Sequence, residues 1–328
     1  MAPHATAIIP LLFLSTTPTF GAGGSTHFQI ADRSRSYVDR ASYPDLHRLI
    51  RRDYPKIYRH ASYFPDWGYA VPGAGDFGEE AHWPPFQYAA MDHLIDHYPE
   101  PWSEHAEKLF TFIAGLTCHG EADDAWHFGD TAFLRVATDE DQPIDGAWRT
   151  DIEVGCDMFV QVEKRWWFLE HANWWVPVDD LLLIYADLGH TEVAAEQIEL
   201  GVSLLHTAIA LEDMFAWSLY LPFKLRLPWS NANYLDWWDG GVRNDAELSA
   251  LRMQELWDYK AGDPSSSEPR TDTGTMWRHP RARLPMLAAE LVRDGILSPL
   301  VRREAGALIV GPLVIIDSTE LERRMGEM

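Results

Sequence analysis

The sequence predicts an all-α, multi-helix domain with long loops that are rich in aromatic side chains. Two patterns support this fold class. Apolar residues recur with a helical period along most of the chain, and no segment sustains the strict alternation of a half-buried strand. The chain has 328 residues, 46% of them hydrophobic, so it can bury a large core, and its 15 Trp leave aromatic side chains for a binding surface.

The N-terminal region contains the apolar run AIIPLLFL at residues 7–14. This run has the length of a signal-peptide core and is too short to span a bilayer. Thr19 and Gly21 are small residues that suit cleavage before Ala22. We therefore predict a signal peptide over 1–21 and a secreted, extracellular protein without a transmembrane segment.

Five stretches have the helical period. They are residues 43–61, 87–98, 103–127, 176–190 and 191–220. Ser103 and Thr191 are suitable N-caps for the third and fifth helices, and Gly189 suits the end of the fourth. The segments 63–86 and 227–245 are rich in Gly, Pro and aromatic residues, so we predict ordered, irregular loops there.

The composition changes after the last of these segments. Residues 263–275 lie in a stretch rich in Ser, Pro, Asp and Gly, which is typical of a linker. Residues 276–328 are predicted to form a short helical C-terminal extension. The main domain is therefore expected to span residues 22–262.

The formal charge of −23, from 27 basic and 50 acidic residues, limits the possible partners. It disfavours duplex nucleic acid and electrostatic docking on anionic lipid, because both are negatively charged. A local metal site can still bind a phosphate, since bound cations reverse the local field. The two cysteines, Cys118 and Cys156, would form one disulfide or remain two buried thiols, and their number favours neither alternative.

The stretch TCHGEADDAWH, residues 117–127, sets His119, Asp123 and His127 four residues apart. A helix brings residues at this spacing to one face. A histidine and a carboxylate placed in this way can chelate one ion, and the second histidine can reach a neighbouring ion. The HxxxD pattern is also common by chance, and a polar helix face is the alternative interpretation.

Three further segments contain side chains that can bind metal. His27 lies in STH, Asp66 follows a proline in FPDW, and His82 precedes Trp83 and two prolines in EEAHWPPF. Each segment alone is unremarkable in composition. An ordered loop stiffened by proline and aromatic residues is nevertheless a suitable support for a rigid metal site.

Together these segments resemble the catalytic domain of glycosylphosphatidylinositol-specific phospholipase D. That domain belongs to the zinc-dependent phospholipase C superfamily, which also includes the fungal single-strand nucleases. The resemblance is carried by GSTHFQIADRS, YFPDWGY, WWVPVDDLLLIYADLG and the block from EAHWPPF to DDAWH. It extends from about residue 22 to about residue 260 and implies a multi-helix fold of the phospholipase C and single-strand nuclease type.

The resemblance implies a cluster of two or three zinc ions. One ion would be bound by a set of four side chains, namely Asp66, His82, His119 and Asp123. Asp123 would bridge to a second ion, which His27 and the amine and carbonyl of a mature N-terminal Ala22 would also bind. His127 would bind the third ion.

The pattern breaks at the third site, where relatives carry a second HxxxD. Here Trp148 stands about where the histidine is expected, and Asp151 follows three residues later. We predict that Asp151 is the surviving carboxylate. Glu153, Cys156 and Asp157 are its rivals.

The function implied is that of a secreted, monomeric phosphodiesterase that hydrolyses a phospholipid or a glycosylphosphatidylinositol anchor with zinc-activated water. Asp66 would orient or deprotonate the water, as in relatives. Trp67, Trp83 and Trp126 would line the substrate cleft, with plain packing as the alternative for all three. Two other functions remain open: a single-strand nuclease of the same superfamily, and a non-catalytic module with a degraded third metal site.

Overall fold

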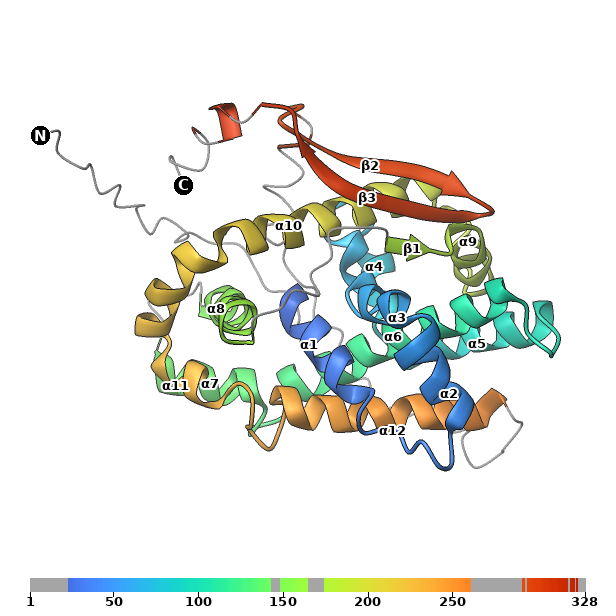
Figure 1. Ribbon diagram of the computed structural model, residues 1–328, viewed down its shortest axis with the longest axis horizontal. Helices are drawn as coiled ribbons and strands as arrows, with labels where there is room; N and C mark the ends of the chain where they lie inside the picture. Colours follow the sequence, from blue (N-terminus) through green and yellow to red (C-terminus); the bar gives the residue numbers. More distant parts are fainter. Residues whose placement is uncertain are drawn as a thin grey trace, which may run out of the picture.

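The structure is a computed structural model that describes residues 23–142, 148–164, 174–260, 291–292, 294–317, 319–321 and 323. Helices dominate the described residues, and strands are confined to one edge of the molecule (Figure 1). The α-helices are α1 (Gly24–Ser34), α2 (Pro44–Arg48), α3 (Pro55–Ala61), α4 (Gly75–Ala81), α5 (Pro84–His97), α6 (Glu104–His127), α7 (Phe133–Asp141), α8 (Trp148–Glu163), α9 (Val178–Asp187), α10 (Ala195–Arg226), α11 (Pro228–Asn233) and α12 (Val242–Lys260). A π-helical turn, η1 (Leu49–Asp53), and a 3-10 helix, η2 (Phe64–Gly68), complete the helical elements, and the strands are β1 (Trp174–Val176), β2 (Leu297–Glu304) and β3 (Ala307–Ile315). The prediction of a mostly helical chain is thereby confirmed.

The predicted helices agree with the structure, with changes at their ends. The N-cap role of Ser103 is confirmed, because its side chain accepts a hydrogen bond from the Ala106 amide at 3.3 Å. Thr191 does not cap α10. The residue before that helix is Ala194, whose amide donates to Gln197 Oε1 at 3.0 Å.

The two predicted loops contain short helices. Helices η2 and α4 lie within 63–86, and α11 lies within 227–245. These helices are five to seven residues long, so they are too short for a helical period to be visible in the sequence. Proline marks the beginning of η2 and of α11, where its missing amide hydrogen costs nothing.

The C-terminal region corrects the prediction of a helical extension. Strands β2 and β3 form an antiparallel hairpin, and β3 also pairs with β1, so that the sheet order is β1-β3-β2. The hairpin contacts α10, along whose first half it lies (Figure 1). Many residues of β3 are apolar and β-branched, and β1 is a short strand more than a hundred residues away in sequence. The β-branched run of β3 and the tight turn between Glu304 and Ala307 are local signals of a hairpin, which the helical prediction overlooked.

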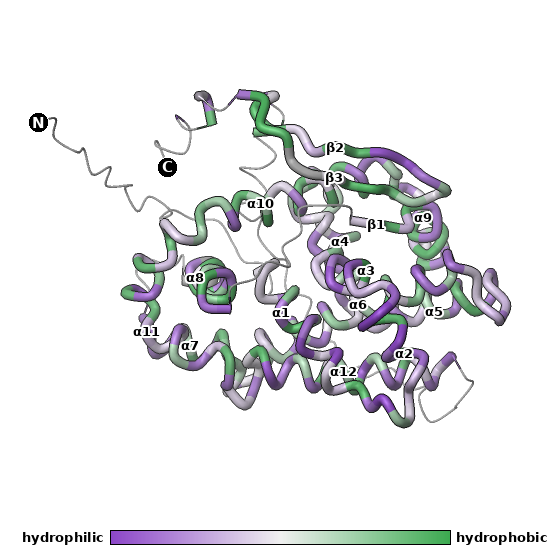
Figure 2. The backbone as a smooth tube through the Cα atoms, viewed as in Figure 1, coloured by the Kyte–Doolittle hydropathy of each residue, from purple (hydrophilic) through white to green (hydrophobic). Residues whose placement is uncertain are grey.

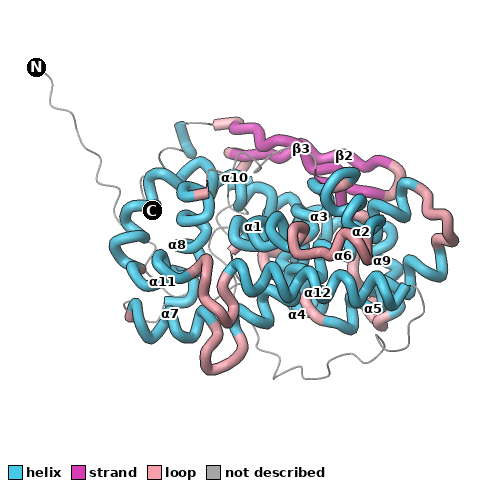
Figure 3. The backbone as a smooth tube through the Cα atoms, turned by 60° about the horizontal axis from the view of Figure 1, so that its bottom comes forward, coloured by secondary structure: helices cyan, strands magenta, loops and turns pink. Residues whose placement is uncertain are grey.

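The core of the molecule is built around α6, which packs against α3, α5, α12 and α1. Hydrophobic and hydrophilic residues are mixed along most helices, and hydrophobic residues are frequent along α10 (Figure 2). Seen from another side, helices surround α6, and the strands stay at one edge (Figure 3). Two glycines allow close approach to α6. A Cβ at Gly115 would lie 2.2 Å from the Tyr58 carbonyl oxygen, and one at Gly120 would lie 2.0 Å from the His82 carbonyl oxygen.

Other sequence predictions have different outcomes. In the part of the chain that the structure describes, no helix combines the length and the apolar character needed to cross a membrane. Cys118 and Cys156 are both buried free thiols, which is the second of the two alternatives given above. The predicted signal peptide (1–21), the proposed terminal residue Ala22 and the linker (263–275) lie outside the described residues.

Candidate metal centre

Five of the side chains predicted to bind metal meet in the interior of the molecule. They are His27, Asp66, His82, His119 and Asp123, which we call the five-residue cluster, and all of them are buried. The cluster contains two overlapping groups of potential ligands. Ligand atoms of His27, His119 and Asp123 lie within 4.8 Å of one another, and so do those of Asp66, His82 and His119.

Separate elements contribute these side chains. His119 and Asp123 are one turn apart on α6, and His27 lies on α1, which packs against α6. Asp66 lies in the 3-10 helix η2. His82 follows directly after α4, and the close approach of its carbonyl group to Gly120 brings it next to α6. The helical spacing and the proline-stiffened segment were both visible in the sequence, whereas their convergence depends on the packing of α1, η2 and α4 on α6.

Asp123 is at the centre of the cluster. Its Oδ1 lies 3.3 Å from His27 Nε2, and its Oδ2 lies 3.5 Å from His82 Nε2 and 3.4 Å from His119 Nε2. The second carboxylate is that of Asp66, whose Oδ1 lies 3.3 Å from His82 Nε2 and 3.8 Å from His119 Nε2. Both carboxylates therefore face His82 and His119, and Asp123 also faces His27. His119 is the member common to the two groups of ligands.

The backbone orients two of the imidazoles. His82 Nδ1 lies 2.8 Å from the Gly78 carbonyl oxygen, and His119 Nδ1 lies 2.8 Å from the Ser62 carbonyl oxygen. A carbonyl oxygen only accepts hydrogen bonds, so Nδ1 donates in both cases. In the neutral imidazole, Nε2 then presents a lone pair to the cluster, which is the usual arrangement of a histidine that binds metal.

The inward-facing atoms are poorly satisfied by protein groups. Nε2 of His27, His82 and His119 and both carboxylate oxygens of Asp66 are buried without a hydrogen-bond partner among the described residues. Each such atom costs roughly 1–3 kcal/mol if it stays unsatisfied. A divalent cation with nitrogen and oxygen ligands would satisfy several of them at once, so the residues fit a bound metal ion.

The pKa values of the side chains in the cluster depend on the charges of their neighbours. Burial, reinforced by His119, lowers the pKa of His27. Burial also opposes the charge on His82, but Asp66 and Asp123 outweigh it and raise the pKa of His82 to about 9. Burial would raise the pKa of Asp123, but His119 and His27 hold that pKa well below its usual range. Asp123 is therefore a charged acceptor at neutral pH.

A second pair of buried carboxyl groups holds the start of α1, the helix that carries His27. Asp157 Oδ1 accepts hydrogen bonds from the amide and the hydroxyl of Thr26, both at 2.8 Å, and Glu212 Oε2 accepts one from Ser25 Oγ at 2.9 Å. Burial raises the pKa of both carboxyl groups. These contacts give Asp157 a positioning role. The sequence analysis did not identify Glu212, although an acidic residue in the apolar run of α10 was a visible signal.

The third predicted site has a different geometry from the one expected. His127 Nε2 lies 4.0 Å from Glu153 Oε1. Asp151 instead forms an ion pair with Arg226, whose Nη2 donates to Asp151 Oδ2 at 2.5 Å. Of the rival carboxylates on α8, Glu153 is thus the one beside His127, and Cys156 is buried in the core.

The three tryptophans predicted to line a cleft are not equivalent. Trp67 and Trp126 are fully buried in the core, which agrees with the packing alternative for these two. Trp67 packs against Tyr185 and donates from Nε1 to its hydroxyl at 3.0 Å. Trp83 is only partly buried, and its ring centroid lies 5.9 Å from that of His82, so it borders the cluster.

Comparison with known proteins finds relatives that share one name. The mouse phosphatidylinositol-glycan-specific phospholipase D is 29% identical over 243 residues, which are 72% of this chain and 29% of the mouse protein. The human protein of the same name is 30% identical over 229 residues, which are 67% of this chain and 27% of the human protein. The protein from Dictyostelium discoideum is 24% identical over 228 residues, which are 68% of this chain and 24% of that protein. The chain thus spans less than a third of the length of these relatives. No family model matches the chain, and no solved structure matches it significantly. Over the shared part, the chain is a relative of the phosphatidylinositol-glycan-specific phospholipases D.

Proposed function

We propose that this protein is a secreted, zinc-dependent phosphodiesterase that hydrolyses a phospholipid or a glycosylphosphatidylinositol anchor. The names of its relatives support the substrate class. The observation that carries the proposal is the five-residue cluster, in which three imidazoles and two carboxylates meet in the protein interior. The Nε2 atoms of the three imidazoles have no hydrogen-bond partner among the described residues. A domain of the phospholipase C type is the fold that we propose with it.

The cluster would bind two ions. Asp66, His82 and His119 would hold one, and His27 would hold the other. Asp123 would be shared between them, because its Oδ1 faces His27 and its Oδ2 faces His82 and His119. Imidazole and carboxylate ligands without thiolates suit a catalytic zinc site. Zinc held there would lower the pKa of a bound water and neutralise phosphate oxygens.

Asp66 is our candidate for the proton acceptor. Its carboxylate is fully buried, and neither oxygen has a hydrogen-bond partner within the described parts of the chain. The contact between its Oδ1 and His82 Nε2 holds the carboxylate beside the ligands. Asp66 would orient the attacking water and accept its proton on a carboxylate oxygen. The ring of Trp83 would pack against the substrate at the border of the cluster.

A third ion would lie between His127 and Glu153. Their side chains approach each other at 4.0 Å, and both are largely buried. The site would have one imidazole fewer than the HxxxD pattern of the family supplies. We therefore expect this ion to bind more weakly than the two in the five-residue cluster.

The test combines metal analysis with assays on three substrates. Protein purified without chelator is expected to contain close to two or more zinc ions per chain. It should hydrolyse a dispersed phospholipid or release a protein with a glycosylphosphatidylinositol anchor, and a chelator should abolish this activity until zinc is restored. Metal-free protein, or zinc-loaded protein that cleaves only single-stranded DNA, would overturn the proposal.

A matched pair of variants assigns the activity to the cluster. Asp66→Asn should lower turnover by about 100-fold or more, because the amide cannot accept the proton. Asp76→Asn changes an exposed carboxylate on the neighbouring helix α4 and should leave turnover unchanged. Equal activity of both variants would remove Asp66 from the reaction.

Secretion is tested separately. Expression of the full chain in a secreting host should release protein into the medium. Its N-terminal sequence should begin at Ala22, since the small residues Thr19 and Gly21 precede that position. Retention of the protein in the cell with residues 1–21 intact would contradict this part of the proposal.

A further inference from the structure

The second half of α10 carries a stripe of exposed apolar side chains. Met214, Trp217, Leu221 and Leu225, which we call the α10 stripe, are 44%, 74%, 58% and 74% exposed. They follow one another at spacings of three and four residues and therefore lie on one side of the helix. Trp217 and Leu225 are the two most exposed of the large apolar side chains that the structure describes. This side of α10 points away from the protein interior.

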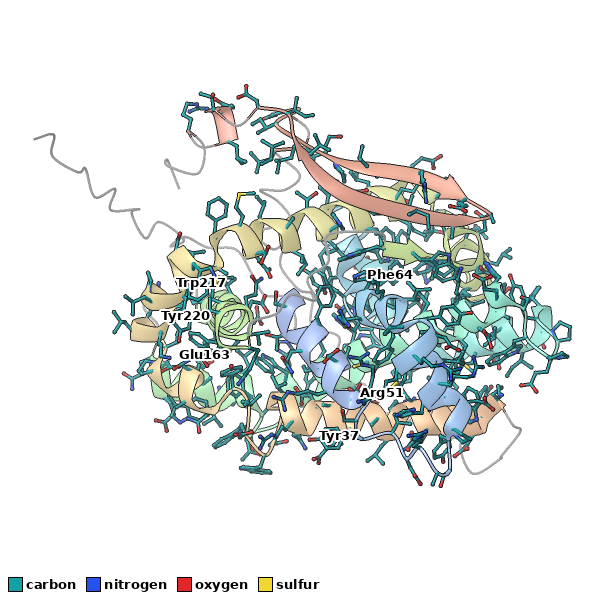
Figure 4. The ribbon with its side chains drawn as sticks, viewed as in Figure 1. Tyr37, Arg51, Phe64, Glu163, Trp217 and Tyr220 are labelled. Atoms are coloured by element: carbon teal, nitrogen blue, oxygen red, sulfur yellow. The ribbon has the colours of Figure 1, made fainter. Side chains whose placement is uncertain are left out.

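The opposite side of the same helix is attached to the protein interior, where Ala216 and Phe223 are buried. Two side chains at the border of the stripe are fixed as well: the Tyr220 hydroxyl donates to Glu163 Oε1 at 2.8 Å, and Lys224 Nζ donates to the same oxygen at 2.9 Å. Figure 4 shows Trp217 and Tyr220 on α10 and Glu163 beside them on α8. The stripe is therefore held outward by a defined set of inward contacts and does not result from loose packing of the helix.

The charge of this segment differs from that of the rest of the chain. Residues 214–235 contain Lys224 and Arg226 and no acidic residue, whereas the whole chain has a formal charge of −23. The charges of Lys224 and Arg226 are balanced by Glu163 and Asp151. The stripe is thus an apolar ridge whose nearby basic side chains are already paired, which suits the surface of a bilayer of zwitterionic lipid and does not require an acidic partner.

We propose that the α10 stripe docks the protein on the surface of a phospholipid bilayer. This inference rests on the proposed function, because a substrate with its acyl chains in a bilayer must be reached from that surface. From Met214 to Leu225 the helix is only about 17 Å long, so it would lie in the interface and not cross the membrane. Trp217 would occupy the headgroup level, where tryptophan is favoured.

The first test measures binding of the full chain to vesicles of phosphatidylcholine by flotation. Replacement of Trp217, Leu221 and Leu225 together by Ser should weaken binding by at least about tenfold, because large apolar side chains no longer leave water. Leu251→Ser is the matched control, since Leu251 is 57% exposed on α12, outside the stripe, and should not affect binding. Addition of anionic lipid should not strengthen binding, because the chain is strongly acidic.

The second test locates the contact on the wild-type surface. Cys118 and Cys156 are buried, and burial raises the pKa of both thiols, to about 11 for Cys118, so they do not compete for a thiol label. An environment-sensitive label on Ser218→Cys, next to Trp217, should shift to the blue with vesicles. The same label on Glu247→Cys, an exposed position on α12, should not shift.

The outcomes separate docking from catalysis. The triple variant should hydrolyse a short-chain phospholipid, dissolved as monomers, at the wild-type rate. Vesicle binding without hydrolysis of any substrate would preserve the docking surface and overturn only the proposed function. Failure of the wild-type protein to bind vesicles, or equal binding by the triple variant, would overturn the docking proposal. Concentration-dependent dimerisation that the triple variant abolishes, without vesicle binding, would assign the stripe to a second copy of the chain and also overturn it.

Discussion

The five-residue cluster and the group around His127 both lie at the C-terminal half of α6, but their charges are balanced in different ways. In the cluster, Asp66 and Asp123 face the imidazole nitrogens of His27, His82 and His119. Around His127, Glu153 approaches the imidazole, whereas Asp151 is neutralised by Arg226. A carboxylate that already has a protein cation gains less from a metal ion. The comparison therefore predicts tight metal binding in the cluster and weak binding beside His127.

The largest effect is expected from Asp123, because its two carboxylate oxygens face all three imidazoles of the cluster. Asp123→Asn should remove most of the bound metal and lower hydrolysis by about 1000-fold, since a neutral amide cannot bridge two cations. Metal content and turnover are the measurements. Asp124→Asn, an exposed neighbour on α6, is the control and should change neither. Full metal content in the Asp123 variant would remove the reason for treating the cluster as the principal site.

The next effect distinguishes the two carboxylates on α8. Glu153→Gln should lower the occupancy of a third ion and reduce turnover by about 10- to 100-fold, as for groups that support a metal site. Asp151→Asn should leave the metal content unchanged and lower the free energy of unfolding by about 1–3 kcal/mol, because Arg226 loses its partner. Metal analysis and urea unfolding measure the two effects. The opposite pattern would restore Asp151 as the ligand predicted from the sequence.

The five residues of the cluster were found by combining local patterns with the family resemblance, which supplied the set of ligands. His119 and Asp123 follow from the helical repeat, and the segments around Asp66 and His82 are marked by proline and aromatic residues. The choice between Asp151 and Glu153 could not be made in this way. Residues two apart on a helix point about 200° apart, so the orientation of α8 decides which of them faces α6. That orientation depends on α10, which supplies Arg226 from a distant part of the sequence.

The C-terminal extension and the buried tryptophans differ in what the sequence could show. The helical prediction for the C-terminal extension failed because the β-branched run of β3 was not recognised as a strand, although it pairs mainly with β2, its neighbour in sequence. For Trp67 and Trp126, residue type alone left cleft lining and core packing as equal alternatives. Their burial depends on contacts made by distant elements, such as Gly201 on α10, where a Cβ would lie 2.3 Å from the Trp67 carbonyl oxygen. Tertiary packing therefore decides between the alternatives for the two tryptophans, and local patterns do not contain it.

A smaller effect concerns the competition between protons and metal at His82. Its raised pKa of about 9 means that folded, metal-free protein binds a proton more tightly than the unfolded chain does. The charged imidazole therefore stabilises the metal-free protein below its ordinary pKa of 6.5, and this contribution is lost as the pH rises through about 9. Metal must displace the proton, so metal affinity should fall by about tenfold for each pH unit below 9.

Two measurements check this dependence. Competition with a chelator between pH 7 and pH 9 gives the slope of metal affinity. Urea unfolding of metal-free wild-type and His82→Gln proteins gives the stability that the charged imidazole contributes, and the difference between the two proteins should shrink from pH 6.5 to pH 9.5. A difference that stays constant over this range would contradict the coupling of His82 to Asp66 and Asp123.

The smallest effect tests whether the close packing at α6 positions the cluster. Gly120→Ala would place a Cβ 2.0 Å from the His82 carbonyl oxygen, and Gly115→Ala would place one 2.2 Å from the Tyr58 carbonyl oxygen. Both variants should lose about 1–3 kcal/mol of unfolding free energy, because backbone atoms must move apart. Only Gly120→Ala displaces a ligand, so only this variant should also lower metal affinity, by about threefold to tenfold. Equal metal affinity in the two variants would mean that His82 does not need the close approach of α6. The contacts of its imidazole with Asp66 and Asp123 would then be sufficient to hold it in the cluster.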